Sequence, residues 1–360
     1  MPLRSARDGD RTMTKNSNPR VVTFGEIMLR LSTPGFSRFL QADRFDATYG
    51  GGEANVAASL ALLGHEAAFV SRLPANDIGQ AALNHLRRFG VDTRFIARGG
   101  DRLGVYFLET GASQRASRVI YDRAGSAVTE MEPGDVDARA AMHDAGWFHF
   151  TGITPALGEA PRRTLAALLD AAADAGATVS CDLNFRAKLW TEAEARRIMR
   201  PLMRRVDVCI ANEEDAEKSL GLRADGSSVE GGELSEAGYM RLAHQLRESY
   251  GFRAVAITLR ESHSATRNGW SALLLDDEEC STPTRSRVYD VHLVDRVGGG
   301  DSFAAGLVHG LTTMSSSRDA LEFAVAASAL KQTTPGDFNL ASADEIAKLA
   351  GGGGSGRVER

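Results

Sequence analysis

The stretch Asp295-Arg296-Val297-Gly298-Gly299-Gly300-Asp301-Ser302-Phe303-Ala304-Ala305-Gly306 joins a strand-like run, 288–294, to an apolar helical run. Glycines let backbone amides come close to a ligand, and a helix N-terminus adds about half a positive charge. This combination predicts a cradle for an anion, with the carboxylate of Asp301 at its rim. The plainer interpretation is a glycine turn in which Asp301 is an ordinary helix cap.

A carboxylate in that position has a chemical use. It can accept a proton from a hydroxyl group while the amides hold the charge that develops on a phosphoryl group. We therefore expect Asp301 to act as a general base and Gly298, Gly299 and Gly300 to form an anion hole.

Outward from this stretch, short β-rich runs alternate with segments of helical periodicity. That rhythm indicates βαβ units, and hence a mostly parallel, doubly wound sheet with helices on both faces. Over 301–333 two helices are expected in succession. Strands are expected at 21–29, 67–72, 147–152, 178–183, 206–211 and 254–259, and helices at 54–63, 80–88, 162–175, 192–203, 213–220 and 239–249.

Two segments, about 28–50 and 103–123, have a different pattern. They contain short alternating runs broken by Gly and Ser, with no helix between, which is typical of antiparallel hairpins. We expect them to form a small β-sheet lid on the α/β body. Composition predicts the other boundaries: a disordered extension over 1–19, one domain over 20–350, and a flexible, glycine-rich tail over 351–360.

The composition excludes several classes of protein. The 360 residues include 42 basic and 47 acidic side chains, a formal charge of −5, so no basic excess points to nucleic acid or an anionic membrane as a partner. No apolar run is long enough to span a bilayer, and the N-terminus lacks the apolar centre of a secretory signal. The three cysteines lack the spacing of a zinc site or a disulfide framework. A cytoplasmic protein is expected.

Further polar clusters accompany the first one. Tyr49-Gly50-Gly51-Gly52-Glu53-Ala54-Asn55-Val56-Ala57 is a second glycine loop that leads into a helix. It does not match the G-x-G-x-x-G dinucleotide pattern, and the chain has no G-x-x-x-x-G-K-[ST] phosphate loop. Acidic groups follow two expected strands, at 182–186 and 212–215, where ligands of open α/β sheets gather. Such clusters can hold Mg²⁺ through water, although a solvated helix cap is their commoner use.

Taken together, these features resemble the PfkB/ribokinase family of carbohydrate kinases over about residues 20–345. The loop 50–55 is similar to the family's N-terminal signature, and 295–301 is similar to its C-terminal one, D-T-x-G-A-G-D. The resemblance implies a ribokinase-like, three-layer α/β/α sandwich with a β lid. It further implies ATP as the phosphoryl donor, Mg²⁺ as the accompanying cation, Asp301 as the catalytic base and a homodimer formed through the lid.

Within the family, the stretches 119–127, 151–157, 182–190 and 335–339 are most similar to the subgroup that phosphorylates 2-keto-3-deoxygluconate. This similarity implies a sugar acid that is phosphorylated on its terminal hydroxyl to give the 6-phosphate. It places the sugar acid against Gly50, Tyr106, Tyr121, Arg123, Ile153, Arg186, Asp301 and Asp337. It places ATP against Asn184, Arg186, Leu259, Arg260, Glu261, Ser262, His263, Ser264 and the turn 298–301, and Mg²⁺, through water, near Asn212 and Asp215.

The chain departs from the family pattern at three places. Arg296 stands where the signature has threonine, and Gly299 stands where it has alanine. The family's N-x-x-E, which organises Mg²⁺ and phosphate through water, becomes Asn212-x-x-Asp215, with a carboxylate one methylene shorter. The usual Lys-Gly-rich nucleotide loop becomes 259–264. ATP is still expected, with altered individual contacts.

Two other functions stay open at this point. One is a kinase for a neutral sugar such as fructose or ribose, and the other is a non-catalytic sugar- or nucleotide-sensing protein, since a fold alone does not fix function. The retained Asp301 favours an enzyme, because a sensor needs no base at an anion cradle. Arg123 and Arg186 favour an acidic substrate, because a guanidinium group matches a carboxylate in a two-bond contact.

Overall fold

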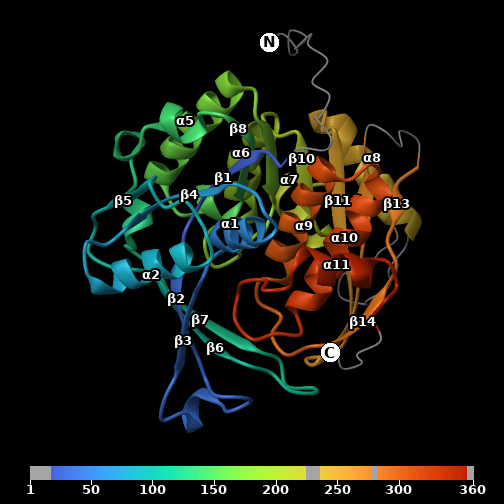
Figure 1. Cartoon of the computed structure of the whole chain (residues 1–360), viewed down its shortest axis with the longest axis horizontal. Helices are drawn as coiled ribbons and strands as arrows, with labels where there is room; N and C mark the ends of the chain where they lie inside the picture. The colour runs from blue at the N-terminus through green and yellow to red at the C-terminus, as the bar shows by residue number, and fades with distance from the viewer. Residues whose placement is uncertain (1–17, 224–235, 277–281, 355–360) are drawn as a thin grey trace.

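The computed structural model describes residues 18–223, 236–276 and 282–354, and its body is one large sheet (Figure 1). The strands from β5 to β11 run parallel to their neighbours, whereas β12 is antiparallel to β11 and pairs with both β13 and β14 (Tyr289–His292). In spatial order the strands are β13 (Thr284–Arg285), β12 (Arg267–Leu275), β11 (Ala254–Ser264), β10 (Val208–Ala211), β9 (Thr178–Asp182), β8 (Ala145–Thr151), β1 (Arg20–Phe24), β4 (Ala67–Leu73) and β5 (Ile96–Arg98).

Helices cover both faces of this sheet, because successive strand residues point to opposite sides. Val21 of β1 belongs to a buried cluster with α1, α9 and α10, whereas Val22 belongs to a cluster with α5, α6 and α8. The expected doubly wound α/β/α fold is thereby confirmed. The helices are α1 (Gly52–Leu62), α2 (Asp77–Arg88), α3 (Ala138–Met142), α4 (Ile153–Ala156), α5 (Glu159–Ala175), α6 (Glu192–Met203), α7 (Glu213–Leu220), α8 (Glu236–Tyr250), α9 (Gly299–Thr313), α10 (Ser317–Lys331) and α11 (Ala343–Ala350).

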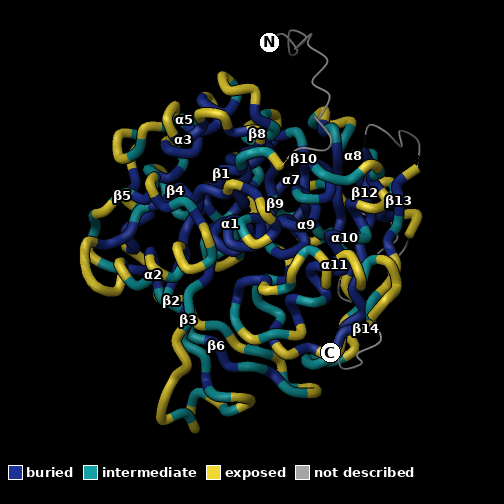
Figure 2. Tube along the Cα trace, viewed as in Figure 1, coloured by how far each residue is buried: buried dark blue, intermediate teal, exposed yellow. Residues whose placement is uncertain are grey.

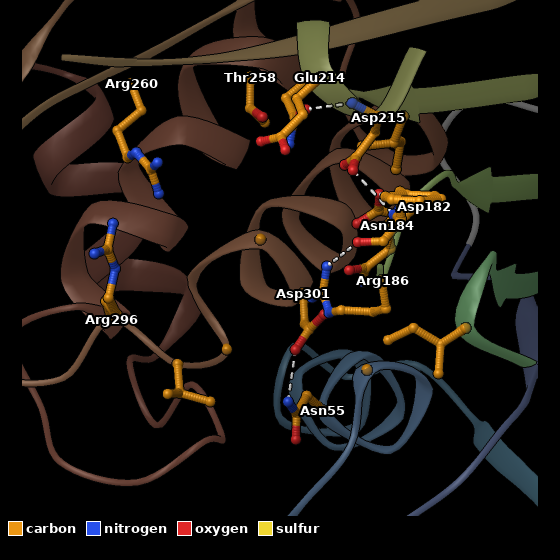
Figure 3. Close-up of a pocket in the computed structure, with 18 of the residues that line it drawn as sticks. Asn55, Asp182, Asn184, Arg186, Glu214, Asp215, Thr258, Arg260, Arg296 and Asp301 are labelled. Atoms are coloured by element: carbon orange, nitrogen blue, oxygen red, sulfur yellow. Dashed lines mark hydrogen bonds between the residues drawn. The ribbon is translucent and has the colours of Figure 1, made fainter. Parts of the chain in front are cut away.

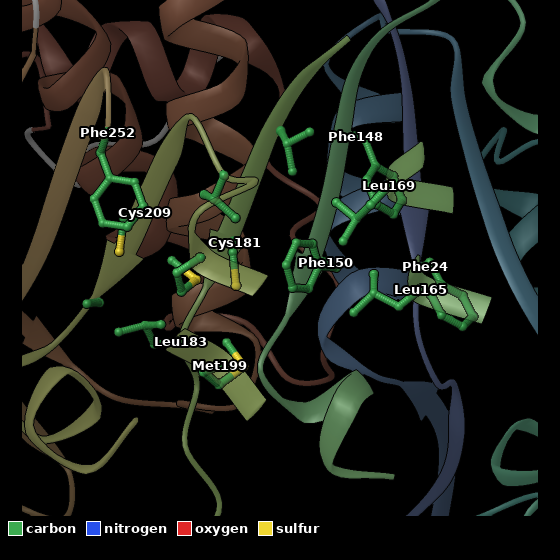
Figure 4. Close-up of a cluster of buried hydrophobic side chains, with 14 of the residues drawn as sticks. Phe24, Phe148, Phe150, Leu165, Leu169, Cys181, Leu183, Met199, Cys209 and Phe252 are labelled. Carbon is green, nitrogen blue, oxygen red and sulfur yellow. The ribbon is translucent and has the colours of Figure 1, made fainter. Parts of the chain in front are cut away.

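The larger buried cluster lies between the sheet and helices α5 to α8 (Figure 4). Phe148 and Phe150 of β8 stack there, with ring centroids 6.1 Å apart, and Leu165 of α5 is fully buried in the same cluster. Figure 2 shows that burial is concentrated in the body, while exposed residues lie at its periphery and at the lid tips. The packed body therefore gives the strand ends a rigid support.

A second sheet forms the lid and projects from the body (Figure 1). Its strand order is β3-β2-β6-β7, with β2 and β6 parallel and the outer pairs antiparallel. The strands are β2 (Met28–Ser32), β3 (Asp46–Gly50), β6 (Val105–Glu109) and β7 (Arg118–Asp122). The two segments expected to form hairpin strands thus make one sheet.

Two expected elements differ from the structure. The single strand expected at 21–29 is divided at Gly25 into β1 of the body and β2 of the lid, because the chain passes close to a buried acid there. A Cβ at Gly25 would lie 2.0 Å from Glu53 Oε2, so only glycine permits this crossing. The nucleotide loop expected at 259–264 is the end of strand β11.

The terminal extension and tail expected at 1–19 and 351–360 fall mostly outside the described residues. Among the helices of the described ranges, none is both long and apolar enough to cross a membrane.

Candidate active site

A cavity of about 1140 Å³ opens at the carboxyl ends of the parallel strands (Figure 3). Its walls come from the N-termini of α1 and α9, from the segments that follow β8, β9 and β10, from β11, and from the lid strands β6 and β7. Carboxyl ends of parallel strands are where open α/β sheets bind ligands. The two glycine loops, far apart in sequence, meet here: a Cβ at Gly52 would lie 3.6 Å from Asp301 Oδ1.

Asp301 stands in the first turn of α9, partly buried in the cavity wall. Asn55 of α1 donates a hydrogen bond from Nδ2 to Asp301 Oδ2 at 2.6 Å. Burial raises the pKa of Asp301 to about 7; Asp337 and Glu53 add to this rise, and the Asn55 hydrogen bond and Arg186 oppose it. A carboxyl group with this pKa can take and release a proton near neutral pH.

The three glycines before Asp301 have different roles. Gly298 has φ +80°, and a Cβ on it would lie 2.0 Å from the Asp337 carbonyl oxygen, so this glycine makes the turn. Gly299 does not line the cavity: its N–H donates to the Arg296 carbonyl at 3.3 Å, and its carbonyl accepts from Ser328 at 2.7 Å. The expectation that all three form an anion hole therefore needs correction.

Gly300 lines the cavity, and a Cβ there would meet open space. The N–H groups of Gly300 and Asp301 have no hydrogen-bond partner among the residues that the structure describes. Two free amides at the start of a 15-residue helix form an anion-binding position, with the carboxylate of the same turn beside it. Of the three glycines predicted to form an anion hole, Gly298 and Gly300 line the cavity and Gly299 does not.

The turn after β9 places Asn184 and Arg186 in the same wall. Asn184 has φ +38°, a left-handed conformation that asparagine tolerates better than most residues, and its N–H donates to Asp182 Oδ1 at 3.2 Å. Arg186 donates to the Phe185 carbonyl at 2.9 Å and has no acidic partner at ion-pair distance in the described ranges. Its positive charge is therefore available to a ligand in the cavity.

Acids gather opposite this guanidinium group. Burial, together with Asp215 and Asp301, raises the pKa of Asp182 well above its usual value. Burial also raises the pKa of Asp215 to about 6, although Arg186 opposes the rise. Asp215 Oδ1 accepts from the Phe185 N–H at 2.9 Å, and Asn212 Oδ1 caps α7 by accepting from the Asp215 N–H at 2.8 Å. Mutually repelling carboxylates in a buried wall suit a cation in the cavity.

The lid supplies the opposite wall through Tyr106, Tyr121 and Arg123. Tyr106 is buried and donates to Asp337 Oδ2 at 2.5 Å, and its ring lies 5.8 Å from that of Tyr121. Asp337, which is 3% exposed, also accepts from Arg30 at 2.7 Å. Tyr106 is thus fixed to a buried acid, and Tyr121 lies beside it in the same cavity wall.

Arg123 has a partner that the sequence did not indicate. Its guanidinium group forms an ion pair with Glu26, which is buried and also accepts from Ser126 at 2.6 Å. The Arg123 group lies 5.5 Å from the centre of the Tyr121 ring. Arg123 therefore faces the cavity in a fixed orientation, with part of its charge already compensated.

Two further arginines face each other at the other end of the cavity. Figure 3 shows Arg260 of β11 and Arg296 of the turn before α9 pointing toward each other. Neither guanidinium group makes a hydrogen bond or an ion pair within the described ranges, and burial and Arg260 lower the pKa of Arg296. Two like charges without an acid between them suit a polyanionic ligand.

The remaining predicted residues divide into two groups. Ile153, Glu261, Ser262 and His263 line the cavity, as expected for contact residues. Gly50, Leu259 and Ser264 do not belong to its lining; Leu259 is buried in the core instead. Gly50 still matters to the site, because a Cβ there would lie 2.0 Å from Asp337 Oδ2.

The sequence alone indicates no role for Asn55, Glu26 or Arg30. Asn55 lies in the glycine loop 49–57, and its position one helical turn after Gly51 is a signal that could identify it. An arginine between two leucines, as at Arg30, is a second signal, because the middle of an apolar strand rarely holds an unpaired charge.

An anion-binding helix start with a carboxylate of matched pKa, under a β lid on an α/β/α body, defines a group-transfer site for a small polar molecule. The chain matches the pfkB family of carbohydrate kinases over residues 18–343, and it belongs to that family. It is therefore a sugar kinase, an enzyme that transfers a phosphoryl group to an alcohol.

Several proteins with assigned names are similar to this chain. A 2-dehydro-3-deoxygalactonokinase of Haloferax volcanii is 34% identical over 336 residues, 93% of this chain and 98% of that protein. The crystal structure of a 2-dehydro-3-deoxygluconokinase from Thermotoga maritima has a TM-score of 0.89 and 52% identity, and the match covers 94% of this chain and 99% of that one. A putative ribokinase II from E. coli, solved with ATP and Mg²⁺, shares the fold, with a TM-score of 0.76, 19% identity and coverage of 92% and 98%.

Proposed function

We propose that this protein phosphorylates the terminal hydroxyl group of a 2-keto-3-deoxy sugar acid, with ATP as the donor. The observation that carries the proposal is the start of α9, where two N–H groups without a partner among the described residues and the Asp301 carboxylate face one cavity. The names of the similar proteins from Haloferax volcanii and Thermotoga maritima support a 2-dehydro-3-deoxy (2-keto-3-deoxy) sugar acid as the acceptor.

The proposed mechanism gives each group one task. Asp301 takes the proton of the sugar hydroxyl as its oxygen attacks the γ-phosphorus of ATP. The bond from that phosphorus to the bridging oxygen breaks, and ADP leaves. The Gly300 and Asp301 amides hold the transferring phosphoryl group, since phosphoryl transfer depends on positioning and charge stabilisation. Arg260 and Arg296 bind the phosphates that stay on the nucleotide.

The part of the cavity wall that contains Asp182 and Asp215 fits Mg²⁺ held largely by phosphate and water. Within the described ranges no group of three or more His, Cys, Asp or Glu side chains could bind a metal ion directly. Asp182 and Asp215 would hold hydrated Mg²⁺, and Asn212 would orient Asp215 through the α7 cap. Bound there, Mg²⁺ would neutralise phosphate charge.

The arginines favour an acidic sugar over a neutral one. Among the residues that the structure describes, Arg186 has no acidic partner at ion-pair distance, and Arg123 is held by Glu26 with its guanidinium group in the cavity wall. A carboxylate forms charge-assisted hydrogen bonds with such groups, roughly twice as strong as those of a neutral hydroxyl. A kinase for fructose or ribose is the second candidate, because membership of a carbohydrate kinase family does not by itself fix the sugar.

The deciding experiment measures kcat/KM with ATP for 2-keto-3-deoxygluconate, its galactonate epimer, fructose and ribose. We expect at least a hundredfold preference for one of the two sugar acids, about 3 kcal/mol of discrimination. Equal efficiency with fructose or ribose would show that the acceptor is a neutral sugar. No turnover of any of the four, with ATP still bound, would instead favour a sensing protein.

Arg123 gives a second test of the acid substrate. Because removal of Arg123 alone would leave Glu26 buried without its cation, Arg123→Leu is made together with Glu26→Gln and compared with Glu26→Gln alone. The KM for the sugar acid should rise by roughly tens of fold, with the KM for ATP unchanged. An equal rise in both KM values would mean that Arg123 does not act on the substrate.

We also propose a homodimer formed through the lid. Phe36, Leu40 and Ile120 are exposed apolar side chains of the lid region, and the free edges of a small sheet are otherwise open to pairing. Sedimentation of the purified protein measures the oligomeric state, and a monomer at micromolar concentration would contradict this proposal.

A further inference from the structure

Arg30 is a buried charge in the middle of the lid sheet. It lies on β2, in register with Thr48 of β3 and with Tyr106 of β6, and only 3% of the residue is exposed. A guanidinium group at such a depth requires acidic partners. Both of its acids come from outside the lid, at Asp337 and Asp295.

The two acids belong to different halves of the site. Asp337 lines the cavity beneath Tyr106, on the side where the proposed function places the sugar. Asp295 begins the glycine turn of the phosphoryl side: its Oδ1 accepts from the Val297 N–H at 3.1 Å, and its carbonyl accepts from the buried Lys331 ammonium group at 3.0 Å. One guanidinium group therefore joins both halves.

A direct backbone contact strengthens this link. Gly298 packs so closely on Asp337 that a Cβ there would lie 2.0 Å from the Asp337 carbonyl oxygen. The Gly336 N–H also donates to Asp295 Oδ2 at 3.0 Å. A shift of the Asp337 backbone would therefore press on the turn that presents the Gly300 and Asp301 amides.

We infer that Arg30 is a positioning residue that couples the sugar half of the site to the phosphoryl half. The inference rests on the proposed function. A sugar that orders Tyr106 and Asp337 thereby fixes Arg30, Asp295 and the free amides of α9. Because coupling between two binding sites is reciprocal, bound sugar should tighten nucleotide binding by the same factor as nucleotide tightens sugar binding.

The test is calorimetric titration of the full chain with a non-hydrolysable imido analogue of ATP and Mg²⁺, without and with saturating sugar. The sugar is whichever member of the panel above the wild type binds most tightly. For the wild type we expect sugar to lower the Kd of the analogue about tenfold, within the usual range of coupling. In Arg30→Lys the ratio of the two Kd values should fall below about twofold, because an ammonium group cannot hold two carboxylates in a planar fork.

Two further variants make the result decisive. Asp295→Asn keeps the shape of the acid and removes its charge, so it should also abolish the coupling, and it replaces Arg30→Lys if that variant does not fold. Arg115→Lys is the control, because Arg115, in the connection between β6 and β7, pairs with buried Glu109 of β6 at 2.7 Å without lining the cavity. It should keep the wild-type ratio.

Coupling that survives in both Arg30→Lys and Asp295→Asn would overturn the inference, as would a wild type without coupling. A wild type that couples ATP to fructose or ribose in place of a sugar acid would overturn the proposed substrate and leave the role of Arg30 standing.

Discussion

The substitution Asp301→Asn tests the assignment of the catalytic base. Asparagine keeps the shape of the side chain and an oxygen that can accept from Asn55, but it cannot take a proton at neutral pH. The kcat should fall by roughly two to four powers of ten, the usual contribution of a general base, and the Kd for the sugar should change little. Turnover within a few-fold of the wild type would refute the assignment.

The pH profile of the wild type gives an independent check. A base must be ionised to act, and burial raises the pKa of Asp301 to about 7. The ionised fraction is then about one half at pH 7 and about one tenth at pH 6, so kcat/KM should fall roughly fivefold between them. The residual activity of Asp301→Asn should lose this acidic limb, whereas Asp215→Asn should keep it. If the acidic limb of the pH profile persists in Asp301→Asn, the limb reports the titration of another group.

Stability separates loss of catalysis from loss of fold. Because the folded pKa of Asp301 is raised above its unfolded value, the folded state binds the extra proton between about pH 4 and pH 7, and its stability falls as pH rises through that window. Asp301→Asn has no carboxyl group at this position, so its free energy of unfolding does not fall for this reason. In urea unfolding at pH 8 the variant should therefore be more stable than the wild type, and the difference should vanish near pH 4. An inactive variant that is less stable at pH 8 would indicate a structural role.

The remaining predictions concern the anion-binding parts of the cavity. Gly300→Val should fold with little change in Tm and lose phosphoryl transfer, because the added side chain enters open cavity space. Gly298→Ala should instead lower the Tm, because alanine is strained at this φ and its Cβ would collide with Asp337. Unfolding of Gly300→Val would show that Gly300 has a structural role. Arg296→Thr should raise the KM for ATP about tenfold, the value of one charged hydrogen bond, and leave the KM for the sugar unchanged; an unchanged KM for ATP would remove Arg296 from the nucleotide site.

The sequence predicted the arrangement of strands and helices because its periodicities are strong. Alternation of apolar runs located β8, β9, β10 and their helices within a few residues. The division of the expected strand at Gly25 was missed, because the apolar run continues from β1 into β2 and only the contact with Glu53 shows where the chain changes sheet. The last residues of β11 were expected to form a loop because they occupy the position of the family's nucleotide loop, and the structure continues the strand through them.

Local motifs predicted the residues of the cavity wall that lie in turns, but not the partners that hold them from distant parts of the chain. Motifs located Asp301, Asn184 and Arg186, since each lies in a turn next to a strand end or a helix start. The partners Glu26 and Arg30 were missed, because each reaches its functional neighbour across more than 90 positions of sequence. Only the fold brings such side chains together, and no local pattern records the pairing.

Two acids that follow glycines in the sequence, Glu53 and Asp301, show why environment decides function. Glu53 is buried and accepts three hydrogen bonds, from the Thr151 N–H and hydroxyl and from the Thr154 hydroxyl, so its carboxylate fixes the end of β8. Asp301 accepts one hydrogen bond, from Asn55, and faces the cavity. Burial raises the pKa of both acids, but Asp301 belongs to the cavity lining and Glu53 does not, so only Asp301 is placed to meet a ligand. Glu53 also adds to the rise in the Asp301 pKa, so the buried acid of the glycine loop 49–57 helps to set the base strength of the acid in the first turn of α9.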